Sequence, residues 1–119
     1  ETDYSRGAAR GAAEKLIKAA DPATAVFVAS DAMALEVMAV ARELGKHIPN
    51  DLSIVGFDDN PSGLYGPVGL TTVRQPLIKM AEESVKELNR LIALKKNSPK
   101  KILLPADMVI RESCKPFKG

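Results

Sequence analysis

The stretches TAVFVASD, residues 24–31, and LSIVGFDDN, residues 52–60, decide the fold of this chain. Each begins with an apolar, β-branched run without alternation and ends in a short polar, acidic turn. Such runs are typical of strands buried on both faces, which belong to parallel sheets that helices cover. Parallel strands end at one edge of their sheet, where open α/β folds bind ligands. We therefore expect the polar residues of both turns to converge in one crevice: Ser30, Asp31, Asp58 and Asp59.

Helical periodicity surrounds these two strands. An apolar stripe over residues 5–20 predicts a helix that Ser5 can cap. A second helix is expected from Asp31 to about Leu44, where Gly45 would end it with a left-handed residue. The first part of the chain therefore alternates helix and strand.

The second part of the chain continues this alternation. Residues 71–74 are predicted as a short strand and residues 77–94 as an amphipathic helix. Two further short strands, residues 102–104 and 108–111, are expected on either side of Pro105. Alternating helices and strands with short links predict right-handed crossovers in an α/β layer fold.

Length and composition limit the class of protein. The 119 residues suffice for one domain or part of one, and the chain lacks an initiator Met, so we expect a piece of a longer polypeptide. The net charge is +2 and the charged residues are spread along the chain. The sequence therefore does not predict the concentrated basic surface that a nucleic-acid-binding domain needs. No apolar run reaches the length of a membrane span, and the chain does not open with a basic segment followed by an apolar core; because we expect a piece of a longer polypeptide, the second observation says little about a signal peptide. Cys114 is the single cysteine, so the chain can form no internal disulfide and has no pair of cysteines at metal-ligand spacing. This predicts a reducing, cytoplasmic location.

The expected helix at residues 31–44 is apolar around most of its surface. Between Ala32 and Ala41 only Glu36 is charged. A single stripe would suffice to cover a sheet, so other atoms must cover the remainder. We expect a self-association surface centred on Leu35 and Met38; the alternative is cover by parts of the same polypeptide that are missing from this sequence.

Asp58 is the strongest candidate for ligand binding. A carboxylate at the end of a buried strand can accept hydrogens from two neighbouring hydroxyl groups of a sugar or nucleoside. Asp59, beside Asn60 and Pro61, is expected to stabilise a turn instead. Ser30 and Asp31 are both good helix caps; we expect Asp31 to cap and Ser30 to offer its hydroxyl to the crevice.

Two further residues are weaker candidates for ligand contact. Tyr4 precedes the first helix, where its ring could stack on the apolar face of a ligand. Gln75 lies between a strand and a helix and suits either a cap or a polar contact.

Known catalytic and cofactor motifs are missing from the sequence. It has no G-x-S-x-G, no glycine-rich phosphate loop and no His/Cys ligand pairs, so we expect neither an enzyme nor a cofactor. The alternative from another class is a magnesium-dependent enzyme or phospho-acceptor that uses Asp31, Asp58 and Asp59, because clustered carboxylates suit Mg²⁺.

Three stretches of the chain, residues 28–59, 70–88 and 103–114, resemble in order and spacing the C-terminal half of the effector-binding core of LacI/GalR-family transcription regulators. Their sequences are VASDAMALEVMAVARELGKHIPNDLSIVGFDD, LTTVRQPLIKMAEESVKEL and LLPADMVIRESC, and TDYSRGAARGAAEKLI matches the segment before them. The resemblance implies half of a type I periplasmic-binding-protein-like fold, with a three-layer parallel sheet. It assigns residues 1–59 and 101–114 to the C-terminal subdomain and residues 71–97 to elements of the N-terminal subdomain.

The resemblance also implies roles for single residues. Asp58 falls on the acid that holds ligand hydroxyls, and Ser30 on a polar contact that is often Asn. Tyr4 falls on an aromatic stacking position and Gln75 on a polar residue near the cleft. The implied dimer interface includes Leu35, Met38 and Tyr65.

By this resemblance, the chain is expected to bind a small-molecule effector, a sugar or a related compound, and to dimerise within a transcription repressor. Closure on the effector would control operator binding by a helix-turn-helix domain that this sequence lacks. In the fragment, the strand and helix of residues 71–97 lack the N-terminal subdomain that would pack on them. Two copies could exchange these residues and so cover them in a swapped dimer. The alternative within the same fold is the sugar-binding protein of a transporter.

Overall fold

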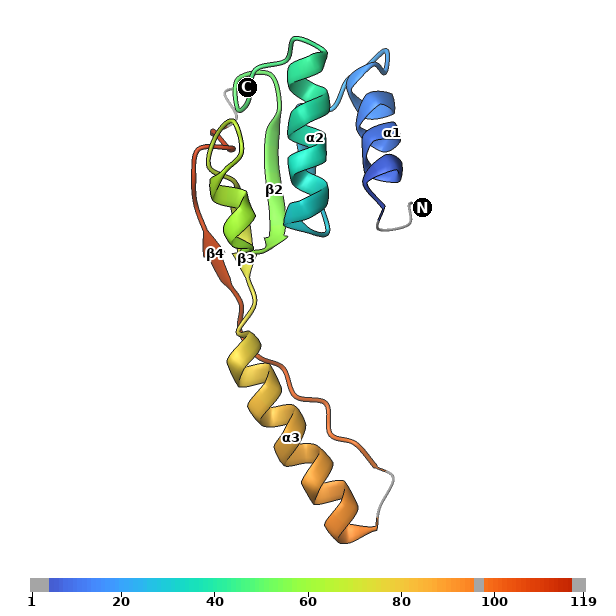
Figure 1. The fold of residues 1–119 in the computed structure, drawn as a ribbon, viewed down its shortest axis with the longest axis vertical. Coiled ribbons are helices and arrows are strands. Elements are labelled where there is room, and N and C mark those ends of the chain that lie inside the picture. The colour runs from blue at the N-terminus through green and yellow to red at the C-terminus, as the bar shows by residue number, and fades with distance from the viewer. Residues whose placement is uncertain (1–4, 96–97, 117–119) are drawn as a thin grey trace. The chain divides into compact units, whose positions relative to one another are not determined.

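The fold is described by a computed structural model, which covers residues 5–95 and 98–116. In chain order the elements are α1 (Arg6–Ile17), β1 (Ala25–Phe27), α2 (Asp31–Glu43), β2 (Ser53–Asp58), the 3-10 helix η1 (Pro61–Leu64), β3 (Thr71–Arg74), α3 (Leu77–Leu94) and β4 (Asp107–Val109) (Figure 1). They form two compact units: unit 1 is residues 1–74 and 108–119, and unit 2 is residues 75–107. No helix in the described ranges is both long and apolar enough to cross a bilayer.

The strands form one sheet in the order β1-β2-β3-β4. β1 and β2 pair in parallel with Val26 opposite Ile54, and β2 and β3 pair in parallel with Asp58 opposite Arg74. Pairing in the same direction requires a crossover between the strands, and α2 provides the one between β1 and β2. The predicted α/β class with a parallel sheet is confirmed.

The helix ends follow local sequence signals. Ser5 caps α1, since its Oγ accepts a hydrogen bond from the Ala8 N–H at 3.2 Å. Gly45 follows α2 with a φ of 71°, a left-handed conformation that glycine adopts without steric penalty. Both features agree with the sequence prediction.

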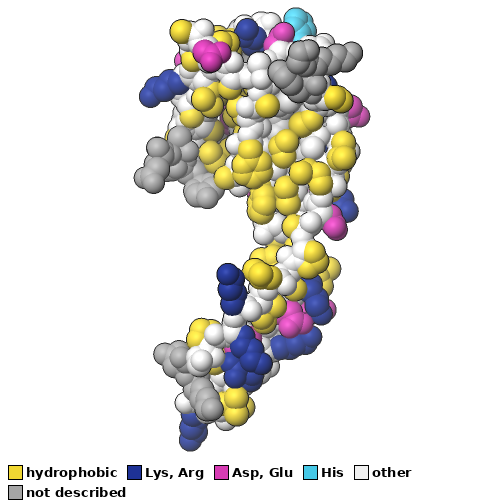
Figure 2. Space-filling model, turned by 180° about the vertical axis from the view of Figure 1, so that it is seen from behind, with side chains coloured by type: hydrophobic (Ala, Val, Ile, Leu, Met, Phe, Trp, Pro, Cys, Tyr) yellow, Lys and Arg dark blue, Asp and Glu magenta, His cyan; other side chains and the backbone are white. Residues whose placement is uncertain are grey.

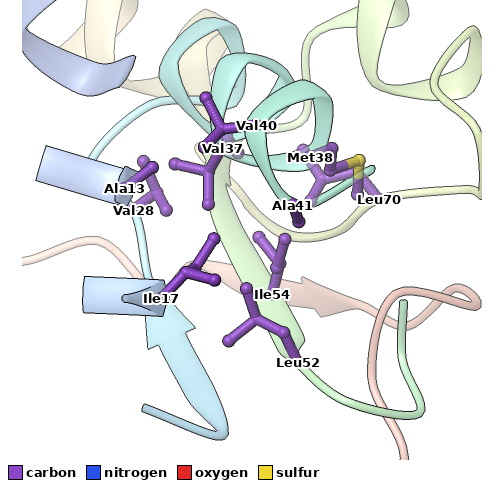
Figure 3. Packing of buried hydrophobic residues seen from close by; sticks show 11 residues of the cluster. Ala13, Ile17, Val28, Val37, Met38, Val40, Ala41, Leu52, Ile54 and Leu70 are labelled. Carbon is purple, nitrogen blue, oxygen red and sulfur yellow. The ribbon is translucent and has the colours of Figure 1, made fainter. Parts of the chain in front are cut away.

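The core of unit 1 lies where α1, α2 and one face of the sheet meet. α2 contacts α1, β2 and η1, so it is the central element of this packing. In Figure 3 the buried side chains of these elements point toward one another. The buried hydrophobic cluster comprises Ala13, Ile17, Val28, Ala34, Val37, Met38, Val40, Ala41, Leu52, Ile54 and Leu70.

The opposite face of the sheet differs from the prediction of strands buried on both sides. Burial alternates along β2, and Phe27 on β1 is 64% exposed, with its ring edge-on to Phe57. Figure 2 shows hydrophobic side chains gathered on the surface of unit 1 that faces the viewer. No described element of unit 1 provides the expected third layer, which is why these apolar residues remain accessible.

Part of the apolar surface of α2 is covered within the described chain. Met38 is 0% exposed within its own chain. An added Cβ at Gly66 would lie 3.1 Å from Leu35 Cδ2 and 3.3 Å from Met38 Sδ, so the loop after η1 packs directly on both residues. Met38 is thus covered by the loop after η1, which is part of this sequence, and neither expected form of cover is needed at this residue. Whether Leu35, Met38 and Tyr65 line a dimer interface stays a prediction.

Unit 2 consists of α3 and the extended segment beside it. The Glu87 carboxylate binds the Arg90 guanidinium and also accepts from the Lys100 N–H at 3.0 Å. Arg90 also donates to the Ser98 carbonyl at 2.9 Å. These bonds hold the segment along α3, but no strand forms at residues 102–104, where one was predicted. A strand requires a neighbouring strand to pair with, and unit 2 as described contains none.

Candidate functional site

The two polar turns lie at the same edge of the sheet. Asp58 is the last residue of β2, and Ser30 follows the adjacent parallel strand β1 by three residues. The backbone N–H of Asn60 donates to Asp31 Oδ2 at 2.7 Å, which joins the turn after β2 to the start of α2. The structure thus brings Ser30, Asp31, Asp58 and Asp59 to one region, as the sequence predicted.

Asp58 has an unusual backbone conformation. Its φ is 117° and that of Asp59 is 55°, whereas residues with a Cβ rarely adopt positive φ. The Asp58 side chain is half-buried. Residues held in such conformations are concentrated at binding and active sites, because the surrounding structure must enforce them. This geometry makes Asp58 the centre of the candidate site.

Ser30, not Asp31, caps α2. Ser30 Oγ accepts from the Met33 N–H at 3.3 Å, so the expectation that Asp31 would be the cap is wrong. Capping uses the hydroxyl oxygen of Ser30 as an acceptor and leaves its hydrogen able to donate to a ligand. The ligand contact predicted for Ser30 is therefore compatible with its role as a cap.

Asp31 is a completely buried carboxylate in the first turn of α2. Its relative exposure is 0%, and its Oδ1 accepts from the Thr72 hydroxyl at 2.6 Å. Together with the bond from the Asn60 N–H, this satisfies both carboxylate oxygens. The N-terminus of a helix also favours a negative charge. Asp31 therefore connects α2, the turn after β2, and β3.

Asp59 forms ion pairs that the sequence analysis missed. Its Oδ1 accepts from Arg111 Nη2 and its Oδ2 from Arg74 Nε, each at 2.6 Å. The bond from Arg111, followed by that from Arg74, holds the pKa of the Asp59 carboxyl below its usual value. Asp59 therefore does more than stabilise its own turn. The three missed partners of these two acids are Thr72, Arg74 and Arg111.

The remaining predicted residues are described only in part. Tyr4 lies outside the described residues. Gln75 is half-buried and is the first residue of unit 2. Of the residues predicted at a dimer interface, Tyr65 is 86% exposed and Leu35 is half-buried.

The described side chains do not favour a magnesium site. Both carboxylate oxygens of Asp31 and of Asp59 already accept hydrogen bonds from protein donors. Within residues 5–95 and 98–116, no three His, Cys, Asp or Glu side chains are placed to hold a metal ion. The arrangement is better suited to fix the turn that carries Asp58 and to offer hydrogen-bonding groups to a ligand.

Comparisons with known proteins identify the family. Residues 1–114 match the family described as the periplasmic binding protein-like domain. The HTH-type transcriptional regulator MalR of Clostridium butyricum is 40% identical over 112 residues, which are 94% of this chain and 33% of that protein. The chain belongs to the periplasmic-binding-protein-like domains of LacI-type regulators. It spans about a third of the length of the curated relatives it matches.

Solved structures of LacI-type regulators share this fold. The structure described as a complex of the transcriptional regulator CelR with cellobiose superposes with a TM-score of 0.85 and 30% identity, over 94% of this chain and 34% of that one. A LacI family regulator from Enterococcus faecium with bound ribose gives a TM-score of 0.81 and 31% identity, over 98% and 43% of the two chains. The suspected resemblance to the LacI/GalR family is therefore confirmed.

Proposed function

We propose that this chain is the effector-binding and dimerisation part of a LacI/GalR-type transcription repressor, with Asp58 as a contact to hydroxyl groups of a sugar. The repressor is not an enzyme in this proposal, and it acts in the cytoplasm. The observation that carries the proposal is the Asp58 carboxylate at the end of β2, at the same sheet edge as Ser30 and on a backbone with a φ of 117°.

The chemistry of this edge supports a polyhydroxy ligand. An ionised carboxylate accepts two hydroxyl hydrogens at once, and the hydroxyl of Ser30 can add a donor. Two similar structures carry ribose and cellobiose in their descriptions, which supports a sugar as the class of effector. The names of the similar proteins support a regulator over a transport component.

We further propose that unit 2 belongs to the N-terminal subdomain of the complete effector-binding core. Its separation from unit 1 at residues 74–75 and 107–108 supports this assignment. Sugar binding would close the two subdomains and move the DNA-binding domains of a dimer. Such coupling between ligand and operator typically amounts to about 1–3 kcal/mol and acts equally in both directions.

The test is the affinity of the full-length protein for ribose and cellobiose, measured by calorimetry, for the wild type and for Asp58→Asn. Replacing the carboxylate by an amide keeps its shape and removes one acceptor and the charge. We expect at least a ~10-fold loss of affinity for a sugar that the wild type binds, since hydrogen bonds to charged groups contribute about 1.5–3 kcal/mol. The same variant should no longer leave operator DNA when that sugar is added.

Asp21→Asn provides the matched control. Asp21 is an exposed aspartate of unit 1, so the same chemical change there should alter neither affinity nor melting temperature. Unchanged sugar affinity and operator release in Asp58→Asn would refute the assignment of Asp58.

We also propose that the complete protein is a homodimer with Tyr65 at its interface. A ring that is 86% exposed on one chain is available to a partner, and tyrosine is enriched at protein interfaces. Sedimentation of the full-length protein should show a dimer that Tyr65→Asp weakens. In the 119-residue chain, exchange of unit 2 between copies would appear as a dimer that persists in Tyr65→Asp.

A further inference from the structure

The turn after β2 has two consecutive residues with positive φ, Asp58 and Asp59. Neither is glycine, so steric repulsion involving the Cβ opposes both conformations. Such a turn persists only where other bonds enforce it. The described structure contains bonds of this kind on both sides of Asp59.

The first set of bonds comes from Asp31, behind the turn. A buried carboxylate is unfavourable unless its oxygens accept hydrogen bonds, so its partners are held firmly. One partner is the backbone N–H of Asn60, and the other is the hydroxyl of Thr72 on β3. An added Cβ at Gly56 would collide with Asp31 Oδ1, which shows how closely this carboxylate lies against β2.

The second set of bonds involves Asp59 itself. Its backbone N–H donates to Thr72 Oγ1 at 3.4 Å, so one hydroxyl serves both Asp31 and Asp59. The Asp59 side chain, 12% exposed, is held by Arg74 and by the more buried Arg111. Arg111 is fixed in turn, since its guanidinium donates to the Leu70 carbonyl at 2.7 Å. The backbone after Asp58 is thus attached to α2, to β3 and to the segment after β4.

We propose that Asp31 and Asp59, linked through Thr72, are positioning residues that hold residue 58 in its left-handed backbone conformation. That backbone conformation sets the direction of the Asp58 carboxylate. Its importance for ligand binding rests on the function proposed above. The two acids do not contact the ligand in this proposal. They determine where the Asp58 carboxylate lies before any ligand arrives.

The test compares glycine and alanine at position 58 in the full-length protein without ligand. Both substitutions remove the carboxylate, but only glycine adopts positive φ without strain. Asp58→Gly should therefore melt a few degrees above Asp58→Ala. The same pair is then measured in the Asp59→Asn and Thr72→Val backgrounds, where the turn has lost attachments and alanine can relax. The difference in melting temperature between glycine and alanine should fall to less than half.

A general loss of stability would not change this difference, so the comparison separates positioning from an ordinary structural role. Asp59→Asn is the milder background and keeps the test valid if Thr72→Val fails to fold. Arg10→Gln is the control background, because it removes an ion pair with Glu43 (2.6 Å) elsewhere in unit 1 and should leave the difference intact. If the difference stays the same in Asp59→Asn, and also in Thr72→Val where that variant folds, the proposal is overturned.

Ribose and cellobiose binding distinguishes this proposal from the one on which it rests. If the glycine–alanine difference narrows while Asp58→Asn binds these sugars like the wild type, positioning is supported and the ligand role of Asp58 fails. If the difference stays constant while Asp58→Asn loses affinity, the ligand role is supported and positioning fails.

Discussion

The helix α3 of unit 2 is more clearly amphipathic than α2 of unit 1, but only unit 1 buries the apolar side chains of its helices. In unit 1, α2 has six buried residues, including Val37, Met38 and Val40, and contacts α1, β2 and η1. In unit 2, the 18 residues of α3 include none that is buried. The large apolar residues left exposed along α3 are Leu77, Ile78, Met80, Val85, Leu88, Ile92 and Leu94.

The difference shows that a periodic pattern specifies a helix without specifying its partner. Most helical stability in proteins comes from packing of the apolar face rather than from helix propensity alone. The polar bonds of unit 2 do not replace this packing: the Glu87 and Arg90 side chains are 14% and 28% exposed, yet no residue of α3 is buried. The prediction with the largest effect compares the two units directly, and the next two concern close packing in unit 1 and polar bonds in unit 2.

The contrast in burial predicts unequal costs of truncating side chains in the 119-residue chain. Met38→Ala should lower the free energy of unfolding by about 2–5 kcal/mol, because it removes fully buried atoms and leaves a cavity. Leu88→Ala should change it by less than about 0.5 kcal/mol, because Leu88 is exposed on α3. Urea unfolding followed by circular dichroism measures both values.

Equal costs of these two substitutions in the 119-residue chain would contradict the contrast. The same Leu88→Ala change in the full-length protein sharpens it. A cost there of about 2 kcal/mol or more would mean that other parts of the protein cover α3.

Close packing around Asp31 predicts the second effect. Gly56→Ala should lower the free energy of unfolding by about 1–3 kcal/mol, since the new Cβ would collide with Asp31 Oδ1 and lie 2.9 Å from Leu70 Cδ2. Gly11→Ala is the control: nothing lies within 4 Å of a Cβ added there, inside helix α1. It should stabilise the chain by about 0.5–1 kcal/mol, because alanine favours helix. Chemical denaturation of both variants gives the comparison, and a stable Gly56→Ala would argue against tight packing at this point.

The smallest effect concerns the polar bonds of unit 2 at low pH. The bond from Arg90, and then that from the Lys100 N–H, lower the pKa of Glu87 from 4.5 to about 2. A depressed carboxyl pKa means that the ionised form stabilises the folded state at pH values above 4.5, and that this contribution is lost as the pH falls toward about 2. Hydrogen exchange should show the segment from Ser98 to Leu104 losing protection over this pH range in the wild type.

Glu87→Gln should lack most of that pH dependence, because it has no carboxyl group to titrate. Glu82→Gln is the matched control, since Glu82 lies on the same helix and forms an exposed ion pair with Lys79 at 3.4 Å. An identical pH profile in the wild type and Glu87→Gln would exclude Glu87 as the cause.

Much of the fold could be predicted from local sequence signals. Helix caps such as that of Ser5 act over three residues, and the left-handed Gly45 lies next to the helix that it ends. The end of β2 at Asp58 follows from an apolar run that stops at an acid. Predictions that depend on packing partners were wrong in two places. The strands were expected to be buried on both faces, and residues 102–104 were expected to form a strand. Both require neighbouring elements that unit 1 and unit 2, as described, lack.

The position of the candidate site could be predicted from the sequence, but the hydrogen bonds and ion pairs that hold it could not. The sequence by itself determined which residues stand at the strand ends, because strand length and apolar pattern are properties of neighbouring residues. Only the tertiary structure decided that Asp31 is buried against Thr72, 41 residues away, and that Asp59 binds Arg111, 52 residues away. The physical reason is that hydrogen bonds and ion pairs act over a few ångströms, so they depend on which distant segments the order of the sheet brings together.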